Sequence, residues 1–369
     1  MAYSALITGA TGLLGREIFN SFKKAGWLTV GQGFSRAKPP TIIKANLEEP
    51  DEIIRLLDEA KPQVIVHSAA NRSPDACEKN PEQAKRLNVD ATRTLAEAAS
   101  KRGILLIYIS TDYVFPGVEG EAPYEADAPT RPTNRYGELK RDGEVAVLEA
   151  TRETGLGLVL RVPLLYGPAE SNSESAVNVL LDQIAKARDP AAPPISMDDW
   201  AQRYPTNTQD VARVCNDVAV RYIQERSKGG DLKRLPKILQ FSAEERMTKY
   251  EMCQVLARIL GVEIPAMVPN RKGNDPGAAV QRPFNTKLST KVLADLGINL
   301  HAQKFEQWWR EALKGRSVEH AIIPGSSLRI LFKARHIHKE FSSHAATTKE
   351  VDALTTVCCR SATWQSTAW

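Results

Sequence analysis

A glycine-rich turn near the start of the chain constrains its fold more than any other feature. The residues Thr-Gly-Ala-Thr-Gly-Leu-Leu-Gly (8–15) follow a short apolar run, 5–7, and precede a stretch with helical periodicity, 16–24. This order predicts a strand, a tight turn and a helix. Glycines also mark ordinary turns and helix caps. At the first strand-to-helix turn, however, they let the backbone approach a pyrophosphate, which the helix N-terminus stabilises, so the turn predicts a bound dinucleotide. The three glycines are Gly9, Gly12 and Gly15.

Length, composition and charge narrow the class of protein. The chain has 369 residues, 42% of them hydrophobic, which is enough for two lobes or for one large α/β unit with an extension. Lysine and arginine number 49 and acidic residues 44, without a basic run interleaved with aromatic residues, so we expect no nucleic-acid partner. No apolar stretch approaches the roughly 20 residues that cross a bilayer. We therefore expect no membrane anchor.

The cysteines and the first residues of the chain favour the cytoplasm. The five cysteines are odd in number, and their spacing matches no metal site. The N-terminal residues show no signal-peptide pattern. We expect a cytoplasmic protein without a bound metal.

Apolar runs alternate with amphipathic stretches through the first half of the chain. This alternation predicts parallel strands joined by crossover helices, in a Rossmann-type doubly wound α/β sheet. We assign residues 1–165 to a dinucleotide-binding domain, and residues 166–316 to a smaller, mixed α/β lobe on the substrate side that is partly interleaved with the first. The predicted strands are 5–7, 28–31, 41–45, 64–67, 105–109 and 157–162, and the predicted helices are 16–24, 51–59, 81–102, 136–151, 208–226, 249–260 and 289–296.

The last segment, 317–369, differs in character from the rest of the chain. It has little periodicity and holds four of the six histidines and the cysteine pair 358–359. We expect an atypical tail that is poorly packed or disordered; a lineage-specific terminus is a further hypothesis. A zinc site formed by His336, His338, His344 and the cysteines is an alternative, but these spacings match no structural zinc pattern.

The end of the second predicted strand indicates which dinucleotide binds. In Gly-Gln-Gly-Phe-Ser-Arg (31–36), Arg36 stands where an NAD-specific site usually has a carboxylate for the ribose hydroxyls. A guanidinium offers a phosphate a planar pair of donors, whereas a carboxylate would repel it. We therefore predict NADP rather than NAD; the alternative for Arg36 is a solvated loop arginine. Asn46 and Leu47, after the third predicted strand, are candidates for contacts with adenine.

Three further side chains predict a reductase-type site. Tyr136 and Lys140 lie one helical turn apart, on the same face. A lysine beside a phenol favours the phenolate, which can exchange a proton with a carbonyl oxygen while nicotinamide exchanges a hydride with carbon. Ser110 and Thr111 follow the predicted strand 105–109, where a hydroxyl would orient the same oxygen, and we select Thr111. A Tyr-x-x-x-Lys pair alone is usually a surface contact, but after a glycine turn and a strand-end hydroxyl it is more specific.

Together, these motifs resemble those of the extended short-chain dehydrogenase/reductases. Within that group, Ser-Thr-Asp-Tyr-Val-Phe (110–115) is similar to both dTDP-4-dehydrorhamnose reductases and the regulatory beta subunits of methionine adenosyltransferase. Longer segments favour the beta subunits, and the resemblance extends from about Ala5 to Trp309. These segments are Leu-Arg-Val-Pro-Leu-Leu-Tyr-Gly (160–167), Glu-Ser-Ala-Val (174–177), Gln-Arg-Tyr-Pro-Thr (202–206) and Met-Thr-Lys-Tyr-Glu-Met (247–252).

The resemblance implies a reductase-like fold that binds NADP, associates with the methionine adenosyltransferase catalytic subunit and tunes S-adenosylmethionine synthesis. Ser68 and Asn71 are not the residues expected in every member, and 317–369 does not resemble the C-terminal segment implicated in docking. The resemblance also implies a set of cofactor contacts. They are Gly9, Thr11, Gly12, Leu13, Leu14 and Gly15 at the pyrophosphate, Phe34, Ser35 and Arg36 at the adenosine phosphate, Asn46 and Leu47 at the adenine, and Ser68, Arg72, Tyr136, Lys140 and Leu165 along the rest of the cleft.

Three hypotheses for the function remain open. The chain is a non-catalytic NADP-binding regulatory subunit, an NADPH-dependent reductase of a nucleotide-linked deoxysugar, or a redox-sensing scaffold without turnover. The reductase would use Thr111, Tyr136 and Lys140. Arg282 is its candidate for a nucleotide-sugar contact, and it is equally consistent with a buried structural arginine paired with a carboxylate.

Overall fold

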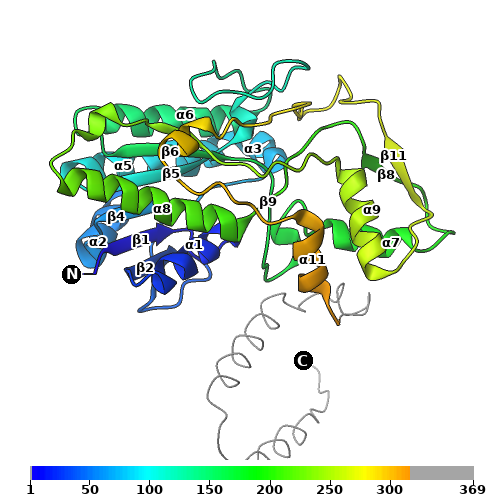
Figure 1. Ribbon diagram of the computed structural model, residues 1–369, viewed down its shortest axis with the longest axis horizontal. Helices are drawn as coiled ribbons and strands as arrows, with labels where there is room; N and C mark the ends of the chain where they lie inside the picture. Colours follow the sequence, from blue (N-terminus) through cyan, green and yellow to red (C-terminus); the bar gives the residue numbers. More distant parts are fainter. Residues whose placement is uncertain (1, 316–369) are drawn as a thin grey trace, which may run out of the picture.

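The computed structural model describes residues 2–315 (Figure 1). The predictions for 317–369, including the tail and the alternative zinc site, lie outside these residues. A seven-stranded sheet in the order β10-β6-β5-β4-β1-β2-β3 forms the centre, and every neighbouring pair is parallel. This confirms the predicted doubly wound α/β fold. The strands are β1 (Ser4–Thr8), β2 (Leu28–Gly33), β3 (Ile42–Lys44), β4 (Val64–His67), β5 (Leu105–Thr111), β6 (Gly157–Val162) and β10 (Ile238–Gln240).

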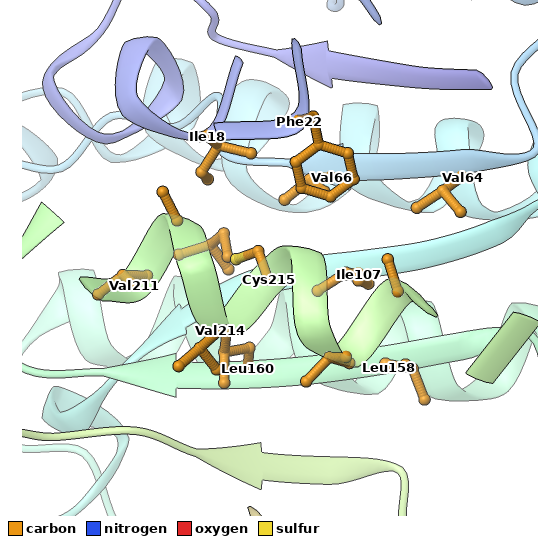
Figure 2. Packing of buried hydrophobic residues seen from close by; sticks show 14 of the residues in the cluster. Ile18, Phe22, Val64, Val66, Ile107, Leu158, Leu160, Val211, Val214 and Cys215 are labelled. Carbon is orange, nitrogen blue, oxygen red and sulfur yellow. The ribbon is translucent and has the colours of Figure 1, made fainter. Parts of the chain in front are cut away.

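Helices cover both faces of the sheet, so its central strands are buried along their whole length. All residues of β4, β5 and β6 are buried, as expected for parallel strands between two helical layers. On one face, Figure 2 shows Ile18 and Phe22 of α1 packed with Val214 and Cys215 of α8 over β4, β5 and β6. The helices are α1 (Leu13–Lys24) and α8 (Thr208–Ser227) on this face, and α2 (Pro50–Ala60), α5 (Ala91–Lys101) and α6 (Arg135–Ala150) on the other.

The strand order fixes where a ligand crevice can form. From β1 the chain builds the sheet outward through β2 and β3, then returns to the other side of β1 and continues through β4, β5 and β6. The loops that leave β1 and β4 therefore diverge at the carboxyl edge of the sheet. In open α/β sheets, this reversal point is where ligands bind.

The predicted helix 81–102 is interrupted in the structure. It consists of α4 (Pro81–Lys85), a π-helical turn η1 (Arg86–Asp90) and α5. The wider turn includes Asn88, whose side-chain amide accepts from the Asn71 N–H at 2.8 Å and donates to the Asn71 carbonyl at 2.9 Å. Hydrophobic periodicity did not reveal this interruption, because one extra residue in a turn hardly changes the pattern.

Elements after residue 166 contribute to both parts of the molecule. Helix α8, which corresponds to the predicted helix 208–226, packs on the large sheet. Strand β10, which we did not predict, forms one edge of that sheet, and α10 (Lys291–Asp295) contacts it. The remaining elements form a smaller lobe around Trp309 and Tyr166. The core of this lobe also includes Leu13 at the start of α1. The lobe contains α7 (Leu180–Ala187), α9 (Lys249–Leu260), α11 (Phe305–Leu313) and the strand pairs β7 (Leu165–Tyr166) with β9 (Thr206–Asn207) and β8 (Ile195–Asp198) with β11 (Met267–Asn270). The domain boundary at 165 remains a prediction.

Residues 2–315 contain neither a helix that could span a membrane nor a group of side chains that could hold a metal ion. Within them, no helix is both long and apolar enough to span a membrane. In the same part of the chain, no three histidine, cysteine or acidic side chains are grouped as they would be around a metal ion.

Candidate functional site

The glycine turn connects β1 to α1 in a conformation that other residues would not tolerate. Gly9 has a φ of 65°, in the left-handed region that favours glycine. A Cβ atom at Gly15 would lie 2.1 Å from the Gly9 carbonyl oxygen, so α1 can begin this close to the strand only without a side chain there. Glycine at these two positions therefore allows the strand and the helix to lie this close; contact of the turn with a pyrophosphate remains a prediction.

Side chains from neighbouring strands hold the turn in place. Buried Gln32 of β2 accepts from the Gly9 N–H at 3.0 Å and donates to the Ala45 carbonyl at 2.7 Å. On the other side, the Ser68 hydroxyl donates to the Thr8 carbonyl at 2.6 Å. The predicted site residues Gly9 and Ser68 thus lie side by side at the reversal point of the sheet.

A buried histidine completes this support. His67 Nε2 lies 3.0 Å from the Thr92 hydroxyl, which itself donates to the Asn88 carbonyl, so Nε2 carries the proton. Nδ1 then accepts from the Thr8 hydroxyl at 2.7 Å. Burial and nearby Lys140 lower the pKa of His67 to about 3, so the ring stays neutral and acts as a structural connector.

The start of α1 suits a phosphate ligand. Gly12 is its N-cap and offers no side-chain acceptor to the first N–H groups of the helix, which belong to Leu13, Leu14 and Gly15. A twelve-residue helix directs these groups and the positive end of its dipole at one point. The turn and the helix end therefore fit a pyrophosphate.

The residues predicted at the adenosine end lie after β2 and β3. Phe34 is 57% exposed, and Lys44 Nζ lies 6.0 Å from its ring centroid. Asn46 Oδ1 accepts from the Glu48 N–H at 3.1 Å, which shapes the loop, and Leu47 is buried in the core. Arg36 is half-exposed and is ion-paired with two glutamates, Glu170 at 2.9 Å and Glu174 at 2.5 Å.

Glu174 also binds Arg16, a buried residue of α1. Arg16 donates to both carboxylate oxygens of Glu174 and, at 2.7 Å, to the Thr11 carbonyl in the glycine turn. Burial alone would raise the pKa of Glu174, but the hydrogen bonds from Arg16 and Arg36 outweigh it and hold this pKa at about 2. The predicted residue Arg72 donates to the Ser173 carbonyl at 3.2 Å, in the same loop.

The predicted reductase side chains come together at the ends of β5 and α6. Strand β5 extends two residues beyond the predicted end at 109, so Thr111 is its last residue rather than part of the segment that follows. Its hydroxyl accepts from the Tyr113 N–H at 3.2 Å. Tyr136 is half-buried, with its ring 6.2 Å from that of Tyr113, and forms a hydrogen bond with Thr111. Lys140 Nζ donates to the Ile109 carbonyl at 2.7 Å. The sheet edge thus brings these hydroxyl, phenol and amine groups into one region.

The protonation states differ from those that the helical spacing suggested. Burial raises the pKa of the Tyr136 phenol, and the hydrogen bond with Thr111 offsets this only in part. Burial lowers the pKa of the Lys140 amine to about 7, against the opposing effect of Glu144. Burial therefore favours the phenol form of Tyr136 over the phenolate.

Two residues fix the position of Tyr136 on α6. Asn134 caps the helix by accepting from the Gly137 N–H at 3.0 Å and also donates to the Gln281 carbonyl at 3.0 Å. A Cβ atom at Gly137 would lie 2.3 Å from the Tyr113 carbonyl oxygen, so glycine allows the helix to approach this closely. The Tyr-Gly-Glu-Leu-Lys segment thus positions both of its functional side chains.

The remaining predicted residues, Arg282 and Leu165, make structural contacts. Arg282 pairs with the Asp75 carboxylate at 3.1 Å, as in the structural alternative, although both side chains are partly exposed rather than buried. Leu165 packs against both the large core and the smaller lobe. Sequence reasoning missed Arg16 and Glu170 altogether, and it noted Glu174 only as part of a family motif.

Comparison with known proteins decides the family. The RmlD substrate binding domain family matches residues 3–318. A Danio rerio protein named methionine adenosyltransferase 2 subunit beta is 41% identical over 309 residues, which cover 84% of this chain and 89% of that protein. The chain belongs to this beta-subunit family within the RmlD group. The Mus musculus protein of the same name is 42% identical over 295 residues, 79% of this chain and 82% of its own length.

Members of the RmlD group also share the fold in solved structures. A dTDP-4-dehydrorhamnose reductase from Bacillus anthracis, crystallised in complex with NADP, has a TM-score of 0.68 and 22% identity, and the match covers 84% of this chain and 97% of that one. At this identity the likeness concerns the fold. It agrees with the parallel sheet described above.

Proposed function

We propose that the chain is an NADP-binding regulatory subunit of methionine adenosyltransferase, without turnover of its own, that modulates S-adenosylmethionine synthesis. The observation that carries the proposal is the 41% identity to the Danio rerio beta subunit along 89% of that protein. The name of that relative implies a catalytic partner. A cytoplasmic location is part of the same proposal.

The geometry of the cleft supports NADP as the ligand. The glycine turn and the N-terminus of α1 would hold the pyrophosphate, Arg36 the phosphate on the adenosine ribose, and Tyr136 with Lys140 the nicotinamide end. When bound, this cofactor can supply a hydride. In a regulator its role is to stabilise the folded arrangement, by a few kcal/mol at about a hundredfold excess over its dissociation constant.

Reconstitution tests the regulatory role. We expect the full-length chain to co-purify with the methionine adenosyltransferase catalytic subunit and to change its rate of S-adenosylmethionine formation. Tyr136→Phe removes only a hydroxyl, so it should preserve both effects. If this variant abolished the effect on synthesis, a purely regulatory role would be wrong. A chain ending at Arg316, assayed in parallel, shows whether the docking surface requires the residues beyond it.

A second candidate function is an NADPH-dependent reductase of dTDP-4-dehydrorhamnose. The proximity of Thr111, Tyr136 and Lys140 favours it, with Tyr136 giving its proton to a carbonyl oxygen that Thr111 orients. This function predicts NADPH oxidation with dTDP-4-dehydrorhamnose, lost in Tyr136→Phe. Absence of turnover by the unmodified chain would count against it.

Substitution of Arg36 tests the proposed preference for NADP over NAD. We expect Arg36→Glu to weaken NADP binding by roughly tenfold or more and NAD binding much less, because only NADP places a phosphate beside the new carboxylate. Calorimetric titration of both nucleotides measures this. Arg234→Glu makes the same charge change at a side chain 88% exposed and serves as the control. Equal losses for the two nucleotides would contradict the role of Arg36.

A further inference from the structure

The loop between β7 and α7 reaches across to the carboxyl edge of the large sheet. We call residues 168–175 the cleft loop. Its glutamates, Glu170 and Glu174, contact two arginines from the glycine-turn side, Arg16 of α1 and Arg36 after β2. Segments more than 130 residues apart in sequence therefore meet at the adenosine end of the cleft.

The four charged groups form one cluster. Arg36 Nη1 lies 2.9 Å from Glu170 Oε2 and 2.5 Å from Glu174 Oε1, and Arg16 Nη1 lies 3.6 Å from Glu170 Oε2. The Glu170 N–H donates to Glu174 Oε2 at 3.0 Å, which keeps the two glutamates together. Two positive and two negative charges thus balance across the cleft.

Hydrogen bonds anchor the second half of the cleft loop. The Ser175 hydroxyl donates to the Leu165 carbonyl at 2.8 Å, and the Asn172 amide donates to Asp182 of α7 at 2.7 Å. Arg72, from the segment after β4, adds a hydrogen bond to the Ser173 carbonyl. The anchored segment 172–175 thus includes Glu174, whereas Glu170 lies before the anchors.

The two arginines differ in their exposure to solvent and in their other contacts. Arg16 is 4% exposed and also supports the Thr11 carbonyl, so its contact with Glu174 is part of the packing. Arg36 is 46% exposed and reaches solvent. A ribose phosphate carries about −1.5 to −2 charges. If it approached Arg36 as it stands, it would meet two carboxylates within 3 Å of the same guanidinium nitrogen.

We propose that Glu170 and Glu174 form a carboxylate latch on Arg36, which the 2′-phosphate of NADP displaces, so that binding of NADP but not of NAD frees Glu170 and loosens the cleft loop around it. This inference rests on the proposed cofactor site and deepens it. The latch lowers the affinity for NADP, because the phosphate must replace existing ion pairs. It also makes the conformation of the cleft loop depend on which nucleotide is bound, and a partner protein could detect that difference.

Glu170→Gln is the variant that tests the latch. Glu174 also pairs with buried Arg16, so its replacement would disturb the fold, whereas Glu170 is 32% exposed. We expect calorimetry on the full chain to show roughly threefold to tenfold tighter binding of NADP and of adenosine 2′,5′-bisphosphate, with NAD changed by less than about twofold. Glu153→Gln, at a side chain 84% exposed in the loop before β6, makes the same charge change as a control and should leave all three affinities unchanged.

A second measurement follows the loop itself. Hydrogen exchange of the amides in residues 170–174 should become faster when NADP binds to the unmodified chain and should stay the same with NAD. Slower exchange with NADP would overturn the latch, because the loop would then be tightened rather than released. Unchanged exchange would overturn it as well.

The outcomes separate the two proposals. If NADP binds to the unmodified chain and equally or more weakly to Glu170→Gln, the latch is wrong and the cofactor site stands. If NADP and NAD both bind more tightly to Glu170→Gln than to the unmodified chain, and by the same factor, the glutamates repel the whole nucleotide and the latch on the 2′-phosphate is wrong. If no nucleotide binds to any variant, the proposed cofactor fails and the latch fails with it.

Discussion

Lys140 keeps its amine inside the protein beside an aromatic ring. The residue is 3% exposed, and its Nζ donates to the Ile109 carbonyl and lies 4.0 Å from the Tyr108 ring centroid. These contacts favour the charged form, but the loss of hydration outweighs them and lowers the pKa to about 7. The residue therefore titrates near neutral pH in the folded chain.

The lowered pKa predicts how stability depends on pH. A lysine in the unfolded chain has a pKa near 10.4, so between pH 7 and pH 10 the unfolded chain binds a proton that the folded chain has released. The contribution of Lys140 to the free energy of unfolding should therefore increase as pH rises through this window and decrease as pH falls towards 7. Relative to Lys140→Met, the wild type should gain about 1 kcal/mol between pH 7.5 and pH 8.5.

Urea denaturation of both proteins at the two pH values measures this gain. Lys24→Met, which removes an exposed lysine of α1, controls for the loss of one positive charge. The same difference between wild type and Lys140→Met at both pH values would contradict the prediction.

Individual residues of the site were predictable where the chemistry is local. Glycine spacing located the turn, and the four-residue spacing of Tyr136 and Lys140 placed both on one helix face. The partners of Arg36 were not predictable, because Glu170 and Glu174 lie 134 and 138 residues away and only the folded chain brings them together. The protonation state of Tyr136 was missed for a similar reason, since burial is a property of the whole fold.

At the scale of elements, a buried ion pair joins α6 to the sheet. Arg161 of β6 donates from Nε and Nη2 to both oxygens of Glu144 on α6, at 2.9 and 2.7 Å. Its Nη1 reaches the Ala126 carbonyl and Gln240 of β10, and the Ser110 hydroxyl of β5 donates to Glu144. One charge pair therefore connects three strands and the helix that carries Tyr136.

We expect Glu144→Gln to destabilise the fold strongly. The substitution keeps the shape but leaves the Arg161 charge buried without its carboxylate, which costs about 3–5 kcal/mol. Replacing both residues together, Glu144→Leu with Arg161→Met, should recover much of the loss, because no buried charge then remains. Urea denaturation measures the free energy of unfolding in each case.

A matched substitution on the same helix provides the control. Glu149 is 60% exposed and pairs with Arg93, so Glu149→Gln should change stability by less than about 1 kcal/mol. If Glu144→Gln lost no more than this control, the ion pair would not hold the elements together.

The elements themselves were predictable to different degrees. The fully buried, mainly apolar strands β4, β5 and β6 and the amphipathic helices α1, α2 and α9 were predictable from their hydrophobic pattern, because each buries a continuous face. Short elements such as β10 and β7 were missed, since two or three residues carry no period and form strands only because a partner strand is already in place.

At the scale of the molecule, the chain passes repeatedly between the two parts. After β7 and α7 in the smaller lobe, α8 and β10 return to the large sheet, α9 lies in the lobe, α10 contacts the sheet and α11 closes the lobe. Each part is therefore built from segments that are separated in sequence by segments of the other. We therefore expect a single cooperative unfolding transition.

Trp309→Ala tests this coupling. Trp309 is fully buried in the smaller lobe against Trp308 and Tyr166, so its truncation should cost about 3–5 kcal/mol. Both far-ultraviolet circular dichroism and tryptophan fluorescence should show one transition at a lower denaturant concentration, with coincident midpoints. Two separate transitions, only one of them shifted, would show that the parts unfold independently.

The outermost position of β10 has a consequence for biosynthesis. A ribosome releases the β6 segment long before residues 238–240, so during translation β6 presents a row of unpaired backbone groups at the margin of a nascent sheet. That margin is protected only after most of the polypeptide has emerged. Until residues 238–240 have been synthesised, this edge of β6 is therefore open to pairing with other chains.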